Sequence, residues 1–326
     1  MKRVLIIVGI LILISCDLGS QQLPLYNQYM LNGFLINPAV AGHDGYTTLT
    51  LNARTQWLGV PNAPNNQAFS AQSRLLKRSH RVKRVSPNKN VLKPSRSGRV
   101  GLGGYVFNDL NGSVSRIGVQ FSYAYHLWVS RSSQLSFGLG ATAYQFRIKQ
   151  LDFYDENEPL VGLGINEPVF VPDADFGVYY RSFNQYKYYI GGSIKNVLQS
   201  YLKVGNRALD DFRLLRHYYL TSGYTFELAN LDIEPSVLLR MSSQLAPQLD
   251  VNVKFYYLKK YWVGLSFRTS KTVVALFGIV VNRFHFGYAF DYEFSSIMSH
   301  TYGSHEFMIS IKLGDNARRF PWLERY

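Results

Sequence analysis

The chain has 326 residues, of which 47% are hydrophobic and only 17% are charged, and its formal net charge is +14. Soluble domains carry about 25% charged residues, and the excess here lies in Tyr and Phe, with 24 and 21 copies. No uninterrupted apolar run reaches the roughly 18 residues of a membrane-spanning helix, so any crossing of a membrane must be made by strands.

The amino terminus has the pattern of a secretory signal peptide over residues 1–20. Lys2 and Arg3 precede an apolar stretch over residues 4–14 that is too short to span a membrane. Two exits fit: residues 13–16 resemble a bacterial lipobox that would lipidate Cys16, and conventional cleavage after Ser20 would remove this only cysteine. With either form of processing the mature chain has no disulfide. An exported chain meets no genome, so its positive charge favours lipid phosphates and acidic partners over nucleic acid.

The segment 21–46 is predicted to be irregular but buried. Pro24, Pro38, Gly42 and Gly45 interrupt regular structure, yet the residues between them are too apolar for a solvated tail. In a barrel, the space available for such a segment is the lumen or its periplasmic mouth. We therefore expect a plug-like segment at 21–46, a barrel at 47–313 and a short periplasmic tail at 314–326.

Fourteen candidate strands follow, and they predict an all-β protein that is a transmembrane antiparallel β-barrel. Most have the roughly 9 to 11 residues that cross a bilayer at a tilt, and bacterial single-chain barrels have an even number of strands. The predicted strands are 47–57, 67–76, 99–108, 114–128, 133–147, 174–181, 187–197, 216–228, 231–241, 248–257, 261–268, 272–281, 284–293 and 306–313.

Strand 284–293 shows the pattern most clearly. Its even positions from Phe284 to Tyr292 are all Phe or Tyr, and its odd positions from His285 to Glu293 are small or polar. Successive side chains of a strand point to opposite faces, so one face is an aromatic ladder. Because the same alternation recurs in strand 114–128 and beyond, we expect apolar side chains toward lipid and polar ones toward the lumen.

The joins between the strands predict which side faces the cell surface. Tight turns at 129–132, 182–186, 229–230, 258–260 and 282–283 alternate with long stretches at 148–173 and 198–215, and short turns are typical of the periplasmic side. Residues 77–98 break this rule, because they are long, lie on the short side and carry eight Lys or Arg with no acidic residue. They are either a solvated insertion or an arm that binds an acidic partner or the cell wall.

The sequence shows no pattern that favours catalysis, a metal or a cofactor. His300, His305 and Glu306 are the nearest grouping of metal-ligand types, and they fit polar residues at a barrel rim better. The acidic residues between Asp152 and Glu158 lack EF-hand spacing, and no G-x-S-x-G nucleophile motif occurs, so an outer-membrane lipase or protease is not indicated. Glycines inside strands suggest bends and close lumen packing; they include Gly101, Gly103, Gly104, Gly138 and Gly140.

Charged residues at inward positions leave two interpretations open. Either they form internal ion pairs that fill the barrel, or they line an anion-selective pore, because the bore at this strand number can be filled or open. The inward charges are Arg54, Arg116, Arg240, Lys254, Arg268, Asp250, Asp291 and Glu293.

Two stretches near the amino terminus form a recognisable motif: YNQYMLNGFLINPAVAG at 26–42 and ARTQWLGVPNAPNNQAFSAQSRL at 53–75. Together with later pieces such as FGYAFDY at 286–292 and GSHEFMISI at 303–311, they resemble the PorP/SprF family of Bacteroidetes outer-membrane proteins. The matching motif residues, expected to contact a partner or the plug, are Tyr29, Asn32, Asn37, Pro38, Ala39, Gly42, Arg54, Gln56, Trp57, Gly59, Gly303, Ser304, His305 and Glu306.

This resemblance implies a non-enzymatic barrel of the bacterial outer membrane that serves the type IX secretion system. Its expected partners are a secreted cargo, such as a large gliding-motility adhesin with a type IX C-terminal signal, other type IX components and outer-membrane lipid. The alternative is a passive outer-membrane porin with a basic lumen. The long basic segment 77–98 departs from the short connection expected in the family.

Overall fold

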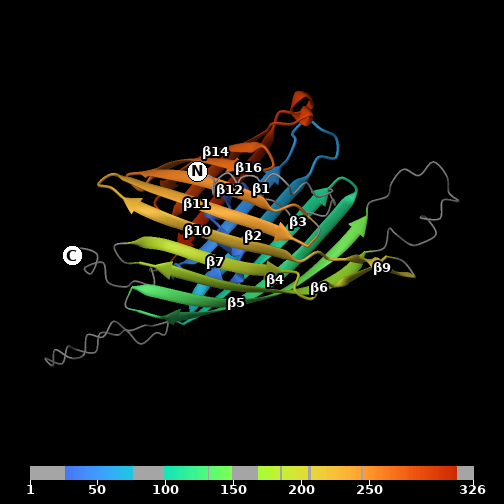
Figure 1. The fold of residues 1–326 in the computed structure, drawn as a ribbon, viewed down its shortest axis with the longest axis horizontal. Coiled ribbons are helices and arrows are strands. Elements are labelled where there is room, and N and C mark those ends of the chain that lie inside the picture. The colour runs from blue at the N-terminus through green and yellow to red at the C-terminus, as the bar shows by residue number, and fades with distance from the viewer. Residues whose placement is uncertain are drawn as a thin grey trace, which may run out of the picture.

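A computed structural model describes residues 26–75, 99–130, 132–148, 168–183, 186–204, 207–243 and 245–313. Within these residues, fourteen antiparallel strands close into a single barrel, which confirms the predicted fold (Figure 1). The signal peptide with Cys16, the basic segment 77–98, the acidic residues between Asp152 and Glu158 and the tail 314–326 lie outside the described residues.

The barrel strands follow one another around the wall in chain order. Each pairs with its neighbours in the chain, and β1 pairs with β16 to close the sheet. The strands are β1 Thr47–Thr55, β2 Asn65–Leu75, β3 Val100–Asn111, β4 Val114–Trp128, β5 Ser133–Ile148, β6 Val169–Ser182, β7 Lys187–Lys195, β10 His217–Glu227, β11 Leu231–Ser242, β12 Gln248–Tyr257, β13 Tyr261–Arg268, β14 Thr272–Val281, β15 Phe284–Glu293 and β16 Ser304–Leu313.

A small hairpin outside the barrel was not predicted. It consists of β8 Tyr201–Val204 and β9 Arg207–Arg213, which pair only with each other between β7 and β10. Its strands are too short to show alternation, so the sequence resembled a long loop. The Gly-Asn dipeptide at residues 205–206 was the available signal, because this pair favours a two-residue hairpin turn.

Strand ends differ from the prediction where the backbone leaves the extended region. β1 stops at Thr55, because Trp57 has a φ of 50°. β6 begins five residues earlier than predicted and includes Pro172. The part of β6 around Pro172 pairs with β5 only, since the ladder to β7 begins at Phe176, and a proline is tolerated on such an unpaired edge.

The two faces of the wall match the predicted alternation. In β4, Ile117, Phe121 and Tyr123 are exposed on the outside, while Gln120 and His126 are buried on the inside. Phe121 is 70% exposed, which would be costly in water but suits contact with lipid hydrocarbon. The described residues contain no helix that is both long and apolar enough to cross a bilayer.

The joins also follow the predicted asymmetry. Strands on one side are linked by residues 129–132, 183–186, 228–230, 258–260 and 282–283, and the start of β1 and the end of β16 lie on this side too. The opposite side carries the joins 149–168, 196–216 and 294–303. We call these the short-turn side and the long-loop side, and in outer-membrane barrels they face the periplasm and the cell surface respectively.

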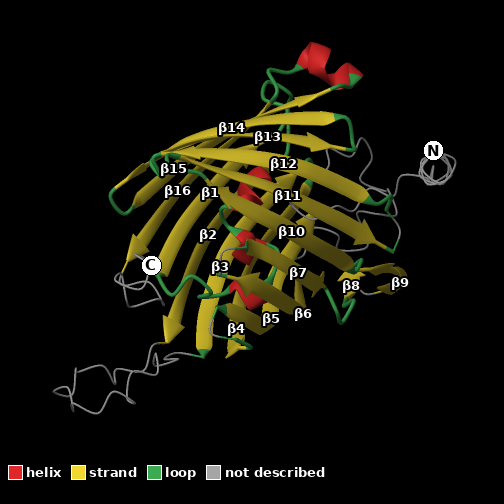
Figure 2. Cartoon of the chain, turned by 60° about the vertical axis from the view of Figure 1, so that its left-hand side comes forward, coloured by secondary structure: helices red, strands yellow, loops and turns green. Residues whose placement is uncertain are grey.

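Residues 26–46, which we call the lumen segment, lie inside the barrel as three single-turn 3₁₀ helices (Figure 2). These are η1 Asn27–Met30, η2 Gly33–Leu35 and η3 Pro38–Val40. A further 3₁₀ helix of the described residues, η5 Ser296–His300, lies in the loop between β15 and β16. The tight turns are closed by bonds three residues apart, such as Leu31 N to Gln28 O at 2.9 Å. Phe34 at the centre of the segment is fully buried.

Candidate functional site

Glycines on the inner face of the wall let the lumen segment approach the strand backbones. A Cβ added at Gly138 of β5 would lie 2.2 Å from the backbone nitrogen of Ala39, and one at Gly101 of β3 would lie 2.0 Å from the carbonyl oxygen of Ala41. Both distances are impossible for real atoms, so any side chain at these positions would displace the segment. The expected close packing is therefore confirmed at Gly101 and Gly138.

The other three strand glycines predicted from the sequence differ in what they contact. Gly103 lies under the ring of Phe34, where a Cβ would be 2.6 Å from the ring, so its predicted lumen packing is also confirmed. Gly104 and Gly140 instead border wall residues such as Gln120, so neither of them makes room for the lumen segment.

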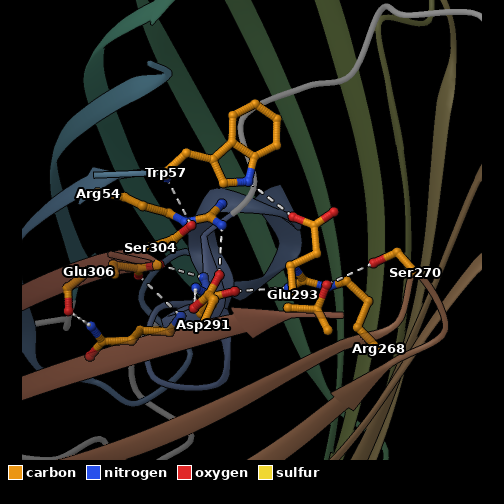
Figure 3. A network of polar contacts seen from close by, with 12 residues as sticks. Arg54, Trp57, Arg268, Ser270, Asp291, Glu293, Ser304 and Glu306 are labelled. Atoms are coloured by element: carbon orange, nitrogen blue, oxygen red, sulfur yellow. Dashed lines mark hydrogen bonds and ion pairs between the residues drawn. The ribbon is translucent and has the colours of Figure 1, made fainter. Parts of the chain in front are cut away.

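The surface-side end of the lumen segment is held by a buried charged network (Figure 3). The backbone N–H of Asn27 donates to Glu306 Oε2 at 2.6 Å, and its side-chain amide donates to Asp291. Asp291 also forms an ion pair with Arg54 at 2.7 Å, while Arg268 donates to Asn27 Oδ1 at 2.9 Å. Removing one partner of a buried ion pair typically costs about 3–5 kcal/mol, so this network fixes the segment firmly.

The network continues along β12 to the next residues of the lumen segment. Asp250 is fully buried and accepts from Arg268 Nε at 3.2 Å, and Arg240 pairs with the same carboxylate. Two positions further along β12, Asn252 Nδ2 donates to the hydroxyl of Tyr29 at 2.6 Å. The wall thus recognises η1 through side chains that are themselves ion-paired or hydrogen-bonded.

Asparagine side chains hold the middle of the segment. Asn32 Nδ2 donates to Asn52 Oδ1 at 3.2 Å, and Asn37 Nδ2 donates to the carbonyl oxygens of Val178 and Gly192 at 3.1 and 3.3 Å. Asn37 Oδ1 meanwhile accepts from Ala39 N at 2.9 Å and so caps η3. Asn37 therefore fixes both the local turn and its place against strands β6 and β7.

The periplasmic end of the segment is held by a turn and a carboxylate. Gly42 has a φ of +66°, and a Cβ there would lie 2.7 Å from a β2 carbonyl oxygen, so only glycine fits. Asp44 contacts His43 at 2.8 Å, Arg181 at 3.0 Å and Lys312 at 3.6 Å. Burial alone would raise the pKa of Asp44, but these three neighbours together hold the pKa well below its usual range.

Two loops contact each other beyond this network, on the long-loop side. Residues 56–64 and 294–303, which we call the loop junction, bond to each other through Leu58 N to Gly303 O at 2.8 Å and Tyr302 N to Leu58 O at 2.9 Å. Trp57 connects the junction to the wall, because its indole N–H donates to Glu293 Oε2 at 3.0 Å. Gly59 has a φ of +99° and packs against the ring of Tyr302.

Ion pairs within the described residues engage the inward cations. Arg54 pairs with Asp291, Arg116 with Asp109, Arg240 and Arg268 with Asp250, and Lys254 with Glu234. Of the two interpretations of the inward charges, internal pairing is therefore the one observed. A cavity of ≈ 70 Å³ lies beside the segment, bordered by Tyr26, Ile36 and Lys195 among others.

Comparison with known proteins decides the family. Residues 18–311 match the family described as type IX secretion system membrane protein PorP/SprF. The chain belongs to the PorP/SprF family. It is a type IX secretion membrane protein with a β-barrel fold and resides in the bacterial outer membrane as a multi-pass barrel. Membership also implies contact with other components of the type IX system.

No curated protein matches this PorP/SprF chain in sequence. Among solved structures, CdiB from Acinetobacter baumannii is 10% identical over 82% of the chain, with a TM-score of 0.43, and the chain spans 60% of its length. The toluene transporter TodX of Pseudomonas putida is 9% identical over 86% of the chain and 91% of its own, with a TM-score of 0.47. The strand pairing of the PorP/SprF chain itself shows the closed barrel.

The structure brings most of the predicted motif residues of this PorP/SprF chain into two groups. The lumen group comprises the residues of the segment and the wall residues that meet its surface-side end: Tyr29, Asn32, Asn37, Pro38, Ala39, Gly42, Arg54 and Glu306. The junction group comprises Gln56, Trp57, Gly59, Gly303 and Ser304. The two groups meet at the end of β1, where Arg54 lies in the strand and Trp57 lies two residues beyond its last residue (Figure 3).

One predicted motif residue, His305, belongs to neither group, although its Nε2 lies 3.2 Å from the carbonyl oxygen of Tyr302 in the loop junction. His305 faces outward between Glu306 and Ser304, accepts or donates a bond to the Tyr288 hydroxyl at 2.6 Å and packs near Phe290. His305 and Glu306 therefore point to opposite faces of β16, which separates two members of the His and Glu grouping seen in the sequence. Within the described residues no group of three or more His, Cys, Asp or Glu comes together as a metal site.

Several contact residues were absent from the predicted motif set. Asn27 and Gln28 carry the backbone N–H groups that bind Glu306, and Gly177 and Gly287 make room for Asn37 and Gln28. The glycines could have been found from their inward position in the alternation, because Gly inside a strand marks close backbone approach. Asn27 and Gln28 gave no such signal.

Proposed function

We propose that this chain supports the export or surface anchoring of type IX cargo as a non-enzymatic barrel closed by its own lumen segment. The cargo class that fits is a large adhesin with a type IX C-terminal signal, as in gliding motility. In this proposal residues 26–46 act as a plug, and the residues of the lumen and junction groups hold that plug and meet a partner.

The observation that carries this proposal is how the lumen is filled. The segment contacts β1 to β7, β12, β13, β15 and β16 through hydrogen bonds or interlocking glycines, and many of its side chains and their wall partners are buried. Such a segment is expensive to displace, because each uncompensated polar group costs about 1–3 kcal/mol. This favours an adaptor that binds its partners through its outer surfaces over a passive channel.

The loop junction supports a surface-side contact. It projects from the rim near the red η5 helix and is rigid, because backbone bonds and the indole of Trp57 tie it to the wall (Figure 1). Leu58, Phe294 and Tyr302 are exposed there, with Tyr302 at 78%. Exposed apolar residues on a rigid support are typical of protein contact sites.

Other contacts complete the proposal. Outer-membrane lipid covers the outward aromatic and aliphatic residues. β2 ends and β3 begins on the short-turn side. For the basic sequence 77–98 that joins them, the two interpretations stay open: a solvated insertion, or an arm for an acidic partner or the cell wall.

The test is a deletion strain compared with wild type by surface proteomics on intact cells. The proposal predicts that the translocon components stay at normal level while a specific large type IX cargo is lost from the surface. A variant with Leu58→Ala and Tyr302→Ala separates the contact from the barrel, and it should fold normally but reduce display of the same cargo. An unchanged surface proteome in the deletion strain would contradict the proposal.

A further inference from the structure

The lumen segment runs through the barrel in one direction. Its first residues contact wall positions near the long-loop side: Arg268 is the last residue of β13, and Glu306 is the third residue of β16. Both strand ends lie on the long-loop side, where β13 and β15 turn into β14 and β16. Asn27 is therefore at the surface-side level of the lumen.

The last residues of the segment contact the opposite end of the wall. Asp44 bonds to Arg181 and Lys312, each the second-last residue of its strand, at the short-turn end of β6 and β16. The carbonyl oxygen of Ala41 meets His126, the third-last residue of β4, at the same end. The segment thus reaches the periplasmic rim before β1 begins at Thr47.

The contacts between these ends follow in order of depth. Met30 O accepts from Lys254 near the middle of β12, and Phe34 lies over Gly103, the fourth residue of β3 from the short-turn end. Figure 2 shows the three short helices placed one after another inside the wall. The path therefore crosses the lumen once, from the long-loop side to the short-turn side.

We propose that the amino-terminal end of the lumen segment faces the cell surface, so that the segment enters the lumen at the surface side and leaves it in the periplasm, where β1 starts. Below Tyr26 the segment itself lies in the lumen, with Phe34 and Gln28 fully buried. This inference rests on the path of residues 26–46 and is independent of the proposed cargo function.

The consequence is that the amino-terminal end of the lumen segment lies on the same side of the barrel as the loop junction. The two are linked inside the wall, because Asn27 contacts Asp291 and Trp57 contacts Glu293 two positions further along β15.

The experiment places a short epitope tag between Gln22 and Leu23, which stays in the mature chain with either exit of the signal peptide. Control tags are placed in the 183–186 turn and in the 243–247 loop, and antibody binding is compared on intact and outer-membrane-permeabilised cells. We expect the tag after Gln22 to be bound on intact cells, like the 243–247 tag. Binding only after permeabilisation, like the 183–186 tag, would overturn the inference.

A second measurement covers the case in which the tag prevents folding. Gln22→Cys is labelled on intact cells with a membrane-impermeant maleimide and compared with Gln185→Cys in the short turn. Cys16 does not interfere, because cleavage removes it and lipidation consumes its thiol. At least tenfold stronger labelling of Gln22→Cys than of Gln185→Cys supports a surface-side start, and equal or weaker labelling contradicts it.

Discussion

The ion pair between Arg54 and Asp291 gives the most quantitative test of how the lumen segment is held. The two side chains are 2% and 3% exposed and 2.7 Å apart, and Asp291 also binds Asn27 of the segment. Asp291→Asn keeps the shape of the side chain but leaves the Arg54 charge without this partner. Breaking a buried pair from one side costs about 3–5 kcal/mol, so the free energy of unfolding should fall by about that amount.

A double-mutant cycle isolates the interaction. Arg54→Met, Asp291→Asn and the double variant are refolded into lipid vesicles, and their unfolding in urea is followed by tryptophan fluorescence. Because the two sites are in contact, the double variant should lose about 1–3 kcal/mol less than the sum of the single losses.

A rim pair provides the matched control. Lys187 and Glu227 also form an ion pair, but their side chains are 34% and 42% exposed. Their coupling in the same cycle should stay below about 1 kcal/mol. If the effects of Arg54→Met and Asp291→Asn are additive within about 0.5 kcal/mol, the reasoning that the buried pair secures the segment is wrong.

Three further predictions concern the segment and the junction. Gly138→Leu should displace the segment, lower stability in urea and raise ion leakage, while Gly192→Ala, whose nearest neighbouring atom is 4.0 Å from the new Cβ, should do neither. Because the pKa of Asp44 is depressed in the folded state, its charge stabilises the fold at pH values above the unfolded pKa of about 3.9, and wild type should be more stable than Asp44→Asn at pH 7. This difference in stability should disappear as the pH falls through the folded pKa. A difference that stays constant to low pH would refute the prediction. Trp57→Phe removes the bond to Glu293 and should cost about 1–2 kcal/mol in the same urea assay, against no change for an exposed substitution at Leu258.

Much of the wall could be predicted from sequence because its code is local. Alternation of large apolar and small polar residues repeats within each strand, as in β15, and turn lengths alone separate the two sides. Boundaries failed where single residues leave the extended region, as at Trp57, and the β8–β9 hairpin was too short for its alternation to be read.

The site could be predicted only in part because it is built from contacts distant in sequence. The resemblance drew attention to Arg54 and Glu306, but the bond from Asn27 to Glu306 joins residues 279 positions apart. Arg54 lies opposite Glu306 only because β1 and β16 close the barrel. The inward charge of Asp291 was evident from alternation, whereas its partner was not. Direction was hidden too, since nothing in residues 26–46 shows which end faces the surface.

Conductance in a planar bilayer tests the central claim most directly, because a barrel closed by its lumen segment and a passive basic porin differ in this one property. Purified wild type should give no steady ion current, and Gly138→Leu should give current through the same barrel. Steady anion-selective current from wild type would contradict a closed lumen and favour the porin.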